Sequence, residues 1–203
     1  MKKLGILLAG LGVFVFIGCS VPPLDVLLDS FEGAINAETV DYGTGQGSSL
    51  KVSADKSLKI CGEQSIRLEY FLKPSSYMWT ARGYNLDVKG AAKWLVKPEE
   101  IKWKKYNAVS MFMYGRNTGA VIAFDVKDAG GEYWRVIIDD DFQYWKEMVF
   151  PFSHFFPRRD WQPETAQRNE VMDFPLMSFQ IEPHMPGNGV CNFDCVKIIK
   201  VKK

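Results

Sequence analysis

The sequence is poor in the residues that most often perform catalysis or hold metal ions. It contains two histidines and four cysteines. His154 lies in Pro-Phe-Ser-His-Phe-Phe and His184 in Glu-Pro-His-Met-Pro, and neither has a plausible catalytic partner. A glycine-rich phosphate loop, a nucleophile elbow and a paired-histidine metal motif are also missing. We therefore predict a protein that binds a partner and is not an enzyme.

Neither sign of charge is in excess. The chain has 25 basic and 24 acidic residues, and loss of Lys2 and Lys3 with the N-terminal segment leaves 23 against 24, or about −1. Because recognition of nucleic acid depends on a basic surface, no nucleic-acid partner is expected.

Only the N-terminus carries a long apolar run. Met1-Lys2-Lys3 precedes the run from Leu4 to Ile17, which is shorter than the ~20 residues that span a bilayer and is typical of a signal peptide over residues 1–18. Phe16-Ile17-Gly18-Cys19 resembles the bacterial lipobox, which implies lipidation of Cys19, with residues 19–25 as a tether. Ser20 resembles the outer-membrane sorting signal of organisms with two membranes. We expect a cell-envelope lipoprotein held on a membrane by its N-terminal lipid; the alternative is an ordinary secreted protein with a chance cysteine.

Helical periodicity is nearly absent, and short alternating apolar runs bounded by Gly, Pro, Asn and Asp recur instead. This pattern predicts an all-β domain over residues 26–203, a two-sheet antiparallel β-sandwich. Residues 43–49 are expected to form a flexible loop and residues 97–101 at most one helical turn. The strands are expected at 26–32, 50–53, 64–72, 77–86, 107–115, 119–127, 132–139, 145–151, 176–182 and 190–201.

Three cysteines follow Cys19, which predicts one disulfide and one free thiol in an oxidising compartment. If Cys191 and Cys195 share a strand, they are roughly 13 Å apart, too far to be bridged. The bridge should therefore join Cys61 to one of them. A zinc site is not expected, because His184 is the only histidine near these thiols.

Alternation within the strands separates two faces of the sandwich. The side chains expected in the core are Val109, Met111, Met113, Ile122, Phe124, Val126, Trp134, Val136, Ile138, Phe179 and Ile181. The opposite face is expected to be mixed aromatic and polar.

Several motifs in order resemble a known family. Leu28-Asp29-Ser30-Phe31-Glu32 and then Cys61-Gly62-Glu63-Gln64-Ser65-Ile66-Arg67-Leu68 resemble the start of galactose-binding-like jelly rolls. With the segments 103–110 and 145–155 and the closing Asn192-Phe193-Asp194-Cys195-Val196-Lys197-Ile198, they resemble family 11 carbohydrate-binding modules and the related complex I intermediate-associated 30 domains. The resemblance covers most of the chain after the signal peptide. It implies a jelly roll with a concave cleft for one β-glucan chain.

Sugar recognition combines flat aromatic rings with planar carboxylate, amide or guanidinium groups. The outward residues with this composition, and hence the candidate polysaccharide-binding set, are Phe112, Tyr114, Asp125, Tyr133, Arg135, Gln180 and Glu182. The alternative is that a sandwich covers its outer faces with mixed residues in any case.

The resemblance also implies a structural Ca²⁺ where the first and last strands meet. Its expected ligands are Asp29, Glu32 and Asp194, completed by carbonyl oxygens of residues 59–62. The alternative is that Glu32 and Asp194 are simply polar strand ends.

Two further segments attract attention. Asp139-Asp140-Asp141 could supply paired carboxylates for a small glycan hydrolase, but three adjacent aspartates are more typical of a solvated loop. The aromatic and basic stretch 155–163 could be a lid over the sugar face or a docking segment for a protein partner. We favour a third interpretation, in which Trp161 plugs the bottom of the sandwich. The main prediction is thus polysaccharide binding, with a scaffold lipoprotein that binds another protein as the alternative.

Overall fold

The computed structural model describes residues 24–202. The expected signal peptide and the lipidation residue Cys19 lie outside the described residues. None of the helices between residues 24 and 202 has the length and apolar character required to cross a membrane.

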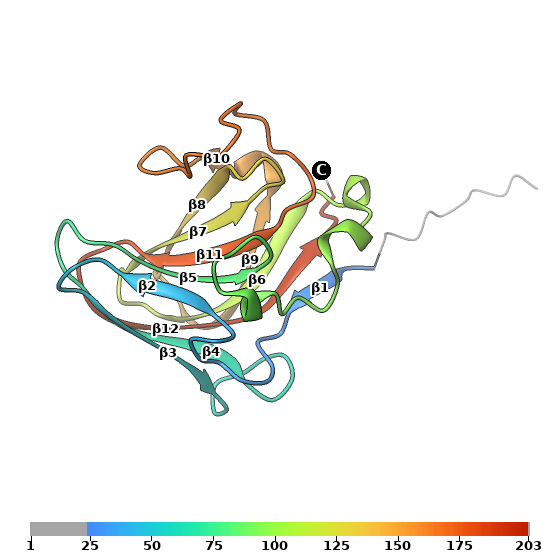
Figure 1. Ribbon diagram of the computed structural model, residues 1–203. Helices are drawn as coiled ribbons and strands as arrows, with labels where there is room; N and C mark the ends of the chain where they lie inside the picture. Colours follow the sequence, from blue (N-terminus) through green and yellow to red (C-terminus); the bar gives the residue numbers. More distant parts are fainter. Residues whose placement is uncertain (1–23, 203) are drawn as a thin grey trace, which may run out of the picture.

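The chain folds into two antiparallel sheets packed face to face (Figure 1). Sheet A has the order β3-β4-β12-β6-β9, with β1 paired to β12, and sheet B has the order β10-β8-β7-β11-β5-β2. The strands of sheet A are β1 (Val26–Asp29), β3 (Ser49–Asp55), β4 (Ser65–Leu72), β6 (Ala108–Arg116), β9 (Gln143–Pro151) and β12 (Gly187–Ile199). Those of sheet B are β2 (Asp41–Thr44), β5 (Met78–Gly83), β7 (Val121–Lys127), β8 (Tyr133–Asp139), β10 (Phe156–Pro157) and β11 (Ser178–Pro183). Four 3₁₀ turns complete the fold: η1 (Lys89–Ala91), η2 (Pro98–Glu100), η3 (Trp103–Lys105) and η4 (Phe152–His154).

The predicted all-β sandwich is confirmed, and each predicted strand matches an observed one. Two short edge strands, β2 and β10, were not predicted. Strand β2 includes Gly43, which the sequence pattern had placed in a loop. Glycine is required there because the Trp79 indole lies over it: a Cβ at residue 43 would lie 2.3 Å from Trp79 Cη2. Tertiary packing thus makes a strand of a segment with weak local strand character.

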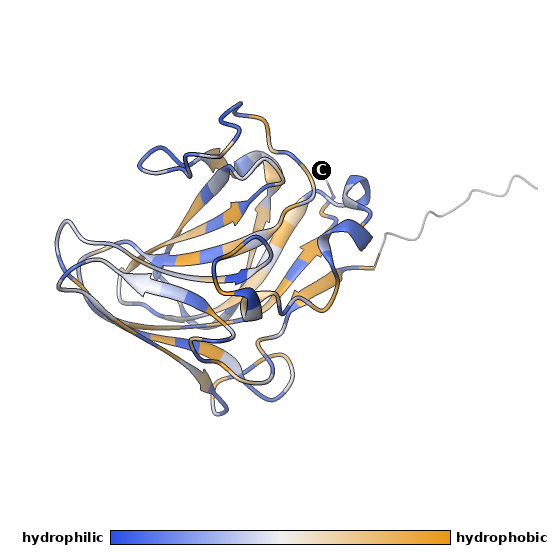
Figure 2. Ribbon diagram, viewed as in Figure 1, coloured by the Kyte–Doolittle hydropathy of each residue, from blue (hydrophilic) through white to orange (hydrophobic). Residues whose placement is uncertain are grey.

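The core lies between the two sheets, and all the residues expected inside are buried. Figure 2 shows apolar residues gathered in the strands and hydrophilic ones in the loops and short helices. The long connection between β5 and β6 contributes Trp94, whose ring stacks on Phe179 with centroids 6.2 Å apart. The sequence pattern therefore predicted these strand residues of the core correctly, and Trp94 is a core residue that it did not identify.

A disulfide joins Cys61 to Cys195, with Cα atoms 5.8 Å apart, and Cys191 is a buried free thiol. The prediction of one bridge from Cys61 is confirmed, and Cys195 is its partner. The bridge ties the loop after β3 to the last strand across 134 residues of sequence.

A buried ion pair links the sheets through the core. Arg82 on β5 donates from Nε to Asp29 Oδ2 at 3.0 Å and from Nη2 to Asp29 Oδ1 at 3.1 Å. Both side chains are almost fully buried. Strand β1 ends at Asp29, whose Oδ1 also accepts the backbone N–H of Phe31 at 2.8 Å. The pair therefore fixes the first strand against the opposite sheet.

Asp29→Ala is expected to lower the free energy of unfolding by about 3–5 kcal/mol, because it leaves the Arg82 guanidinium buried without its counter-charge. The double variant Asp29→Leu with Arg82→Met removes both charges and should lose clearly less. Urea denaturation of the three proteins measures this. Equal losses in the single and double variants would contradict a cost that arises from the unpaired charge.

Candidate functional site

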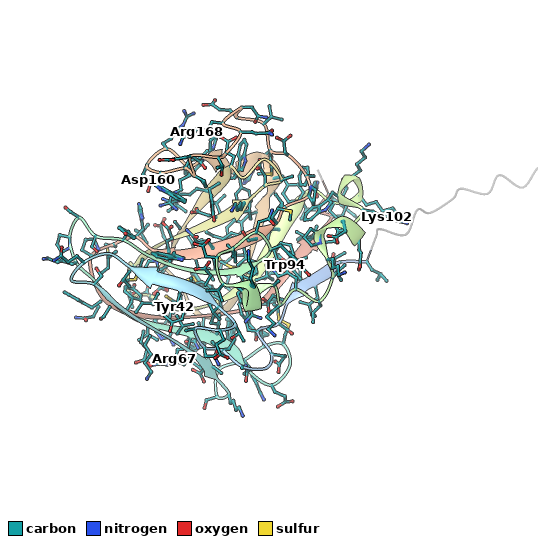
Figure 3. The ribbon with its side chains drawn as sticks, viewed as in Figure 1. Tyr42, Arg67, Trp94, Lys102, Asp160 and Arg168 are labelled. Atoms are coloured by element: carbon teal, nitrogen blue, oxygen red, sulfur yellow. A yellow bond between two sulfur atoms is a disulfide. The ribbon has the colours of Figure 1, made fainter. Side chains whose placement is uncertain are left out.

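The outer face of sheet B is hollowed into a cleft of about 760 Å³. Strands β2, β5, β7, β8 and β11 line it, together with the segment that follows β10. Figure 1 shows this segment, in orange, rising beside β8 and β10, and Figure 3 places Asp160 there. The chain thus forms a concave surface from one sheet, the long loop after β10 and residues 85–87, which follow β5.

Aromatic rings stand on two sides of the cleft. Tyr77 and Trp79 lie on the β5 side, with ring centroids 6.0 Å apart in a stacked arrangement. Trp161 lies on the loop side, 5.7 Å from the Tyr133 ring. Tyr77 is 61% exposed and Trp161 is 52% exposed. Large rings exposed to this degree at the rim of a cleft offer apolar faces to a ligand.

A network of charges lies at the floor of the cleft and directly beneath it. Asp125 on β7 pairs with Arg135 on β8, from Nε to Oδ1 at 2.7 Å and from Nη2 to Oδ2 at 2.8 Å. Arg135 Nη2 also donates to Glu182 Oε2 at 2.6 Å. The strand register brings these groups together, because Gln180, Asp125 and Arg135 are cross-strand neighbours on β11, β7 and β8. Gln180 donates to Glu182.

Arg158 connects the loop to this floor. Its Nη1 donates to Glu182 Oε1 at 2.6 Å and to Asp125 Oδ2 at 3.3 Å. Its Nε and Nη2 donate to the two carboxylate oxygens of Asp160, each at 3.0 Å. The guanidinium also lies 5.4 Å from the centre of the Trp161 ring. One side chain therefore holds both the rim indole and the floor carboxylates in place.

The network contains one carboxylate more than it has guanidinium groups, since Asp125, Asp160 and Glu182 face Arg135 and Arg158. Burial raises the pKa of Asp125 to about 6, because desolvation outweighs the attraction of Arg135. At Asp160, which is half exposed, desolvation acts the same way, but the hydrogen bonds and charge of Arg158 prevail and lower its pKa. Of these two carboxylates, Asp125 therefore takes up a proton more readily, and Asp160 keeps its negative charge.

The far side of the cleft carries a second polar group. Asp41 on β2 accepts the Trp79 Nε1–H at 3.1 Å through Oδ1 and the backbone N–H of Asp87 at 3.1 Å through Oδ2. Lys127 Nζ donates to the Asn85 carbonyl at 2.8 Å. Burial lowers the pKa of Lys127. These contacts fix Trp79 and place polar atoms beside its ring.

Five of the predicted site residues lie together on the outer face of sheet B. Tyr133, Gln180 and Glu182 line the cleft, and Asp125 and Arg135 are bonded to Glu182 or to each other beneath it. They are covered by the loop and are not solvent-exposed: Arg135 is 4% exposed. Alternation predicted their direction correctly, whereas the covering loop was not predictable from it.

Phe112 and Tyr114 are not part of the cleft, which corrects their predicted placement. Both lie on β6 in sheet A, where the register aligns Tyr114 with Asn192 and Asn192 with Arg67. Tyr114 packs against Trp145, with ring centroids 5.5 Å apart. Alternation tells which side of its own sheet a residue occupies, but it does not tell which sheet the strand joins.

The cleft also contains residues that the sequence did not single out as ligands: Asp41, Tyr77, Trp79, Arg158 and Asp160. Tyr77 and Trp79 stand two apart in a predicted strand and therefore share a face. The preferred interpretation of Trp161 was wrong, because its ring lies at the rim of the cleft and does not plug the sandwich. Arg158, which lies against the Trp161 ring, is the residue that anchors this loop to sheet B.

The three predicted calcium ligands do not form an oxygen cage. Asp29 is held by Arg82, and Glu32 Oε1 accepts the backbone N–H of Glu63 at 2.8 Å. Asp194 accepts backbone N–H groups of Ile60 and Cys61 at 2.9 and 3.0 Å through Oδ2. The loop therefore presents N–H donors where the prediction required carbonyl acceptors, and these residues do not fit a calcium ion as a set. Within residues 24–202, the one candidate metal cluster joins Asp194 to the two disulfide sulfurs, which are not free ligands.

The aspartates 139–141 do not form a catalytic pair. Asp140 is buried and accepts the backbone N–H groups of Arg116 and Asn117 at 2.8 and 3.1 Å, while its neighbours are exposed. Asp140 therefore stabilises the turn between β6 and β7. The expected solvated loop is correct for Asp141 only, because Asp139 is exposed but ends strand β8.

Comparison with solved structures supports the sandwich fold. A family 11 carbohydrate-binding module from Clostridium thermocellum, solved in complex with a β-1,3-1,4-mixed-linked tetrasaccharide, is 19% identical and superposes with a TM-score of 0.65, covering 88% of this chain and 97% of that one. The family 30 carbohydrate-binding module of cellulosomal cellulase Cel9D-Cel44B from the same organism is 13% identical, with a TM-score of 0.57, and covers 89% of this chain and 100% of that one. A β-1,2-glucanase from Parabacteroides distasonis is 12% identical, with a TM-score of 0.55 over 88% of this chain and 25% of that one.

No curated protein matches the chain significantly in sequence. A family model does match, namely the carbohydrate binding domain (family 11), over residues 21–201. Because this match spans nearly all of the chain after Cys19, the chain belongs to family 11 of the carbohydrate-binding domains, a family of non-catalytic binding modules.

Proposed function

We propose that this protein is a lipid-anchored protein of the cell envelope whose sheet B cleft binds a single chain of a neutral, β-glucan-like polysaccharide without cleaving it. The observation that carries the proposal is the pair of exposed rings, Tyr77 and Trp161, on two sides of a cleft with a hydrogen-bonding floor. Sugar rings have an apolar face and a rim of hydroxyls, so such a cleft complements both.

The charge of the cleft favours a neutral ligand. Four carboxylate side chains line it, those of Asp41, Asp87, Asp160 and Glu182, against two cationic side chains, those of Lys127 and Arg158. An anionic polymer such as a polyuronate would meet net repulsion. Neutral hydroxyls can instead donate to the carboxylate oxygens and accept from the lysine ammonium group.

Pre-organisation of the cleft also supports a binding role. The contacts of Arg158 with Asp125 and Glu182 hold the loop that carries Trp161 before any ligand arrives. Because this loop is already held in position, less conformational entropy is lost when a ligand binds. Guanidinium groups are hydrogen-bonded to the carboxylates of Asp125 and Glu182, which makes the base of the cleft rigid.

The choice of glycan follows the relatives. The family 11 module from C. thermocellum was solved with a β-1,3-1,4-mixed-linked tetrasaccharide. We therefore take mixed-linkage β-glucan as the first ligand for this cleft, with xyloglucan, xylan and mannan as comparisons.

The anchoring part of the proposal rests on the lipobox-like Phe16-Ile17-Gly18-Cys19. Acyl chains on Cys19 would hold the protein on a membrane durably, since more than one chain is needed for stable anchoring. In an organism with two membranes, Ser20 favours the outer one.

Trp161→Ala is expected to weaken binding of mixed-linkage β-glucan about 10-fold or more, because it removes one of the two exposed ring faces of the cleft. Affinity electrophoresis and titration calorimetry measure the effect. Trp145→Ala on β9 is the matched control, since this indole lies outside the cleft, packed against Tyr114 in sheet A. If both variants bind as the unmodified protein does while remaining folded, the cleft is not the glycan site.

The stability of the cleft network is expected to depend on pH through Asp125. Folding raises its pKa from the ordinary 3.8 to about 6, so protonation is easier in the folded state. The resulting stabilisation is fully present below pH 3.8 and is lost as the pH rises through 6.

Between pH 7 and pH 5, the unmodified protein should therefore gain about 1 kcal/mol of unfolding free energy relative to Asp125→Asn. Urea midpoints of both proteins at the two pH values provide the comparison. A parallel response of the two proteins would show that Asp125 does not titrate in this range.

Cys19→Ala is expected to abolish incorporation of labelled palmitate and to release the protein from the membrane fraction in a bacterial host. Cys191→Ala is the control, because Cys191 is a buried thiol within the sandwich. Unchanged labelling of Cys19→Ala would remove the lipoprotein part of the proposal and leave the glycan-binding part intact.

A further inference from the structure

Lysines gather on the side of the molecule where the first described residues join the sandwich. Figure 3 shows Lys102 on the side of the view where β1 begins in Figure 1, whereas Asp160 of the cleft loop lies on the other side. Seven exposed lysines belong to this surface, which we call the basic pole: Lys93, Lys97, Lys102, Lys104, Lys105, Lys200 and Lys202. The acidic residues of the same segments are Asp25, Glu99 and Glu100, so the basic pole has a net positive charge.

Hydrogen bonds hold the segments of the basic pole together. The backbone N–H of Leu95 donates to the Leu28 carbonyl at 2.7 Å. Tyr106 Oη donates to the Leu24 carbonyl at 3.2 Å, and Asn107 Nδ2 donates to the Val201 carbonyl at 3.1 Å. The lysines of residues 93–105 therefore lie close to both the start and the end of the sandwich.

These lysines are available to an external partner. Within residues 24–202, the ion pairs formed by lysine involve Lys51 and Lys59, and none involves the basic pole. Because the whole chain is nearly neutral, a local excess of lysine here is a real asymmetry of the charge distribution. Two exposed apolar side chains accompany it, Leu24 and Leu95.

We propose that the basic pole binds the anionic phospholipid headgroups of a bilayer. An anionic bilayer attracts each nearby lysine, which strengthens partitioning roughly five-fold per residue. Leu24 and Leu95 can enter the interface beside the lysine ammonium groups, as in other proteins that lie on membranes. A bilayer fits this surface because its charges are spread over several short segments and not lined along a groove.

The orientation of the basic pole rests in part on the proposed lipidation of Cys19. Five peptide units separate Cys19 from Leu24, which at ~3.6 Å per residue reach at most about 18 Å. An anchor this short keeps the basic pole near the headgroups. Binding by the basic pole itself does not require the acyl chains, so it can be measured without them.

The test uses the chain that begins at Ser20, which lacks the lipidation cysteine and retains every described residue. Co-sedimentation with vesicles of phosphatidylethanolamine and phosphatidylglycerol is compared with vesicles of phosphatidylcholine. We expect binding to the anionic vesicles only, and its loss as salt rises to about 0.3 M, where charges are strongly screened. The triple variant Lys102→Gln, Lys104→Gln and Lys105→Gln should bind on the order of 100-fold more weakly.

The matched control is the triple variant Lys51→Gln, Lys56→Gln and Lys73→Gln, which removes three exposed lysines elsewhere. Equal loss in both triple variants, equal binding to neutral vesicles, or no binding to either vesicle would overturn the proposal. Equally tight binding to duplex DNA at the same ionic strength would also overturn it, by indicating a general polyanion surface. Glycan binding by the same preparations and palmitate labelling of Cys19 report separately on the proposed function.

Discussion

The contact between Arg158 and the carboxylates beneath it decides the shape of the functional face. Without the segment after β10, the outer side of sheet B would be a twisted surface carrying charges on neighbouring strands. Arg158 places that segment over Asp125 and Glu182 and carries Trp161 with it. Removing the carboxylates of Asp125 and Glu182 and two guanidinium groups from water is costly unless each group is satisfied by hydrogen bonds. The network supplies these hydrogen bonds and thereby holds the loop after β10 rigidly beside the cleft.

A buried ion pair also lies on the inner side of sheet B. There Arg82 pairs with Asp29 across the core, so a charge pair links β5 to the first strand of sheet A. Buried ion pairs add little net stability compared with apolar residues of equal volume, but they specify geometry, since an unpaired charge is strongly unfavourable. Sheet B therefore has buried ion pairs on both faces. The Arg82–Asp29 pair on the inner face fixes sheet B against sheet A, and the Arg158 network on the outer face fixes the loop that borders the cleft.

The sequence predicted the sandwich because alternation and turn residues are local signals. It also predicted which residues face away from the core: Asp125, Tyr133, Arg135, Gln180 and Glu182 lie on one outer face. The assignment of Phe112 and Tyr114 to that face failed because both sheets alternate in the same way, and pairing of β6 with β12 is a long-range choice.

Two other features could not be derived from local pattern. Arg158 reaches Glu182, 24 residues away in sequence, and only the folded loop brings them together. The strand β2 depends on the Trp79 ring over Gly43, a contact between distant residues. For Asp29, Glu32 and Asp194, the family resemblance implied a role as calcium ligands. Donors on other segments bind these carboxylates instead, namely Arg82 and the N–H groups of residues 60–63.

Although the net charge of the chain is close to zero, two of its surfaces carry opposite charge. The cleft is lined by more carboxylates than cations, whereas the basic pole beside the N-terminus has an excess of lysine. An anionic membrane would attract the second surface and repel the first. Both effects turn the molecule in the same sense, with the cleft directed away from the lipid. A short tether alone would limit the distance of the sandwich from the membrane but would not set its orientation. The charge distribution would set that orientation.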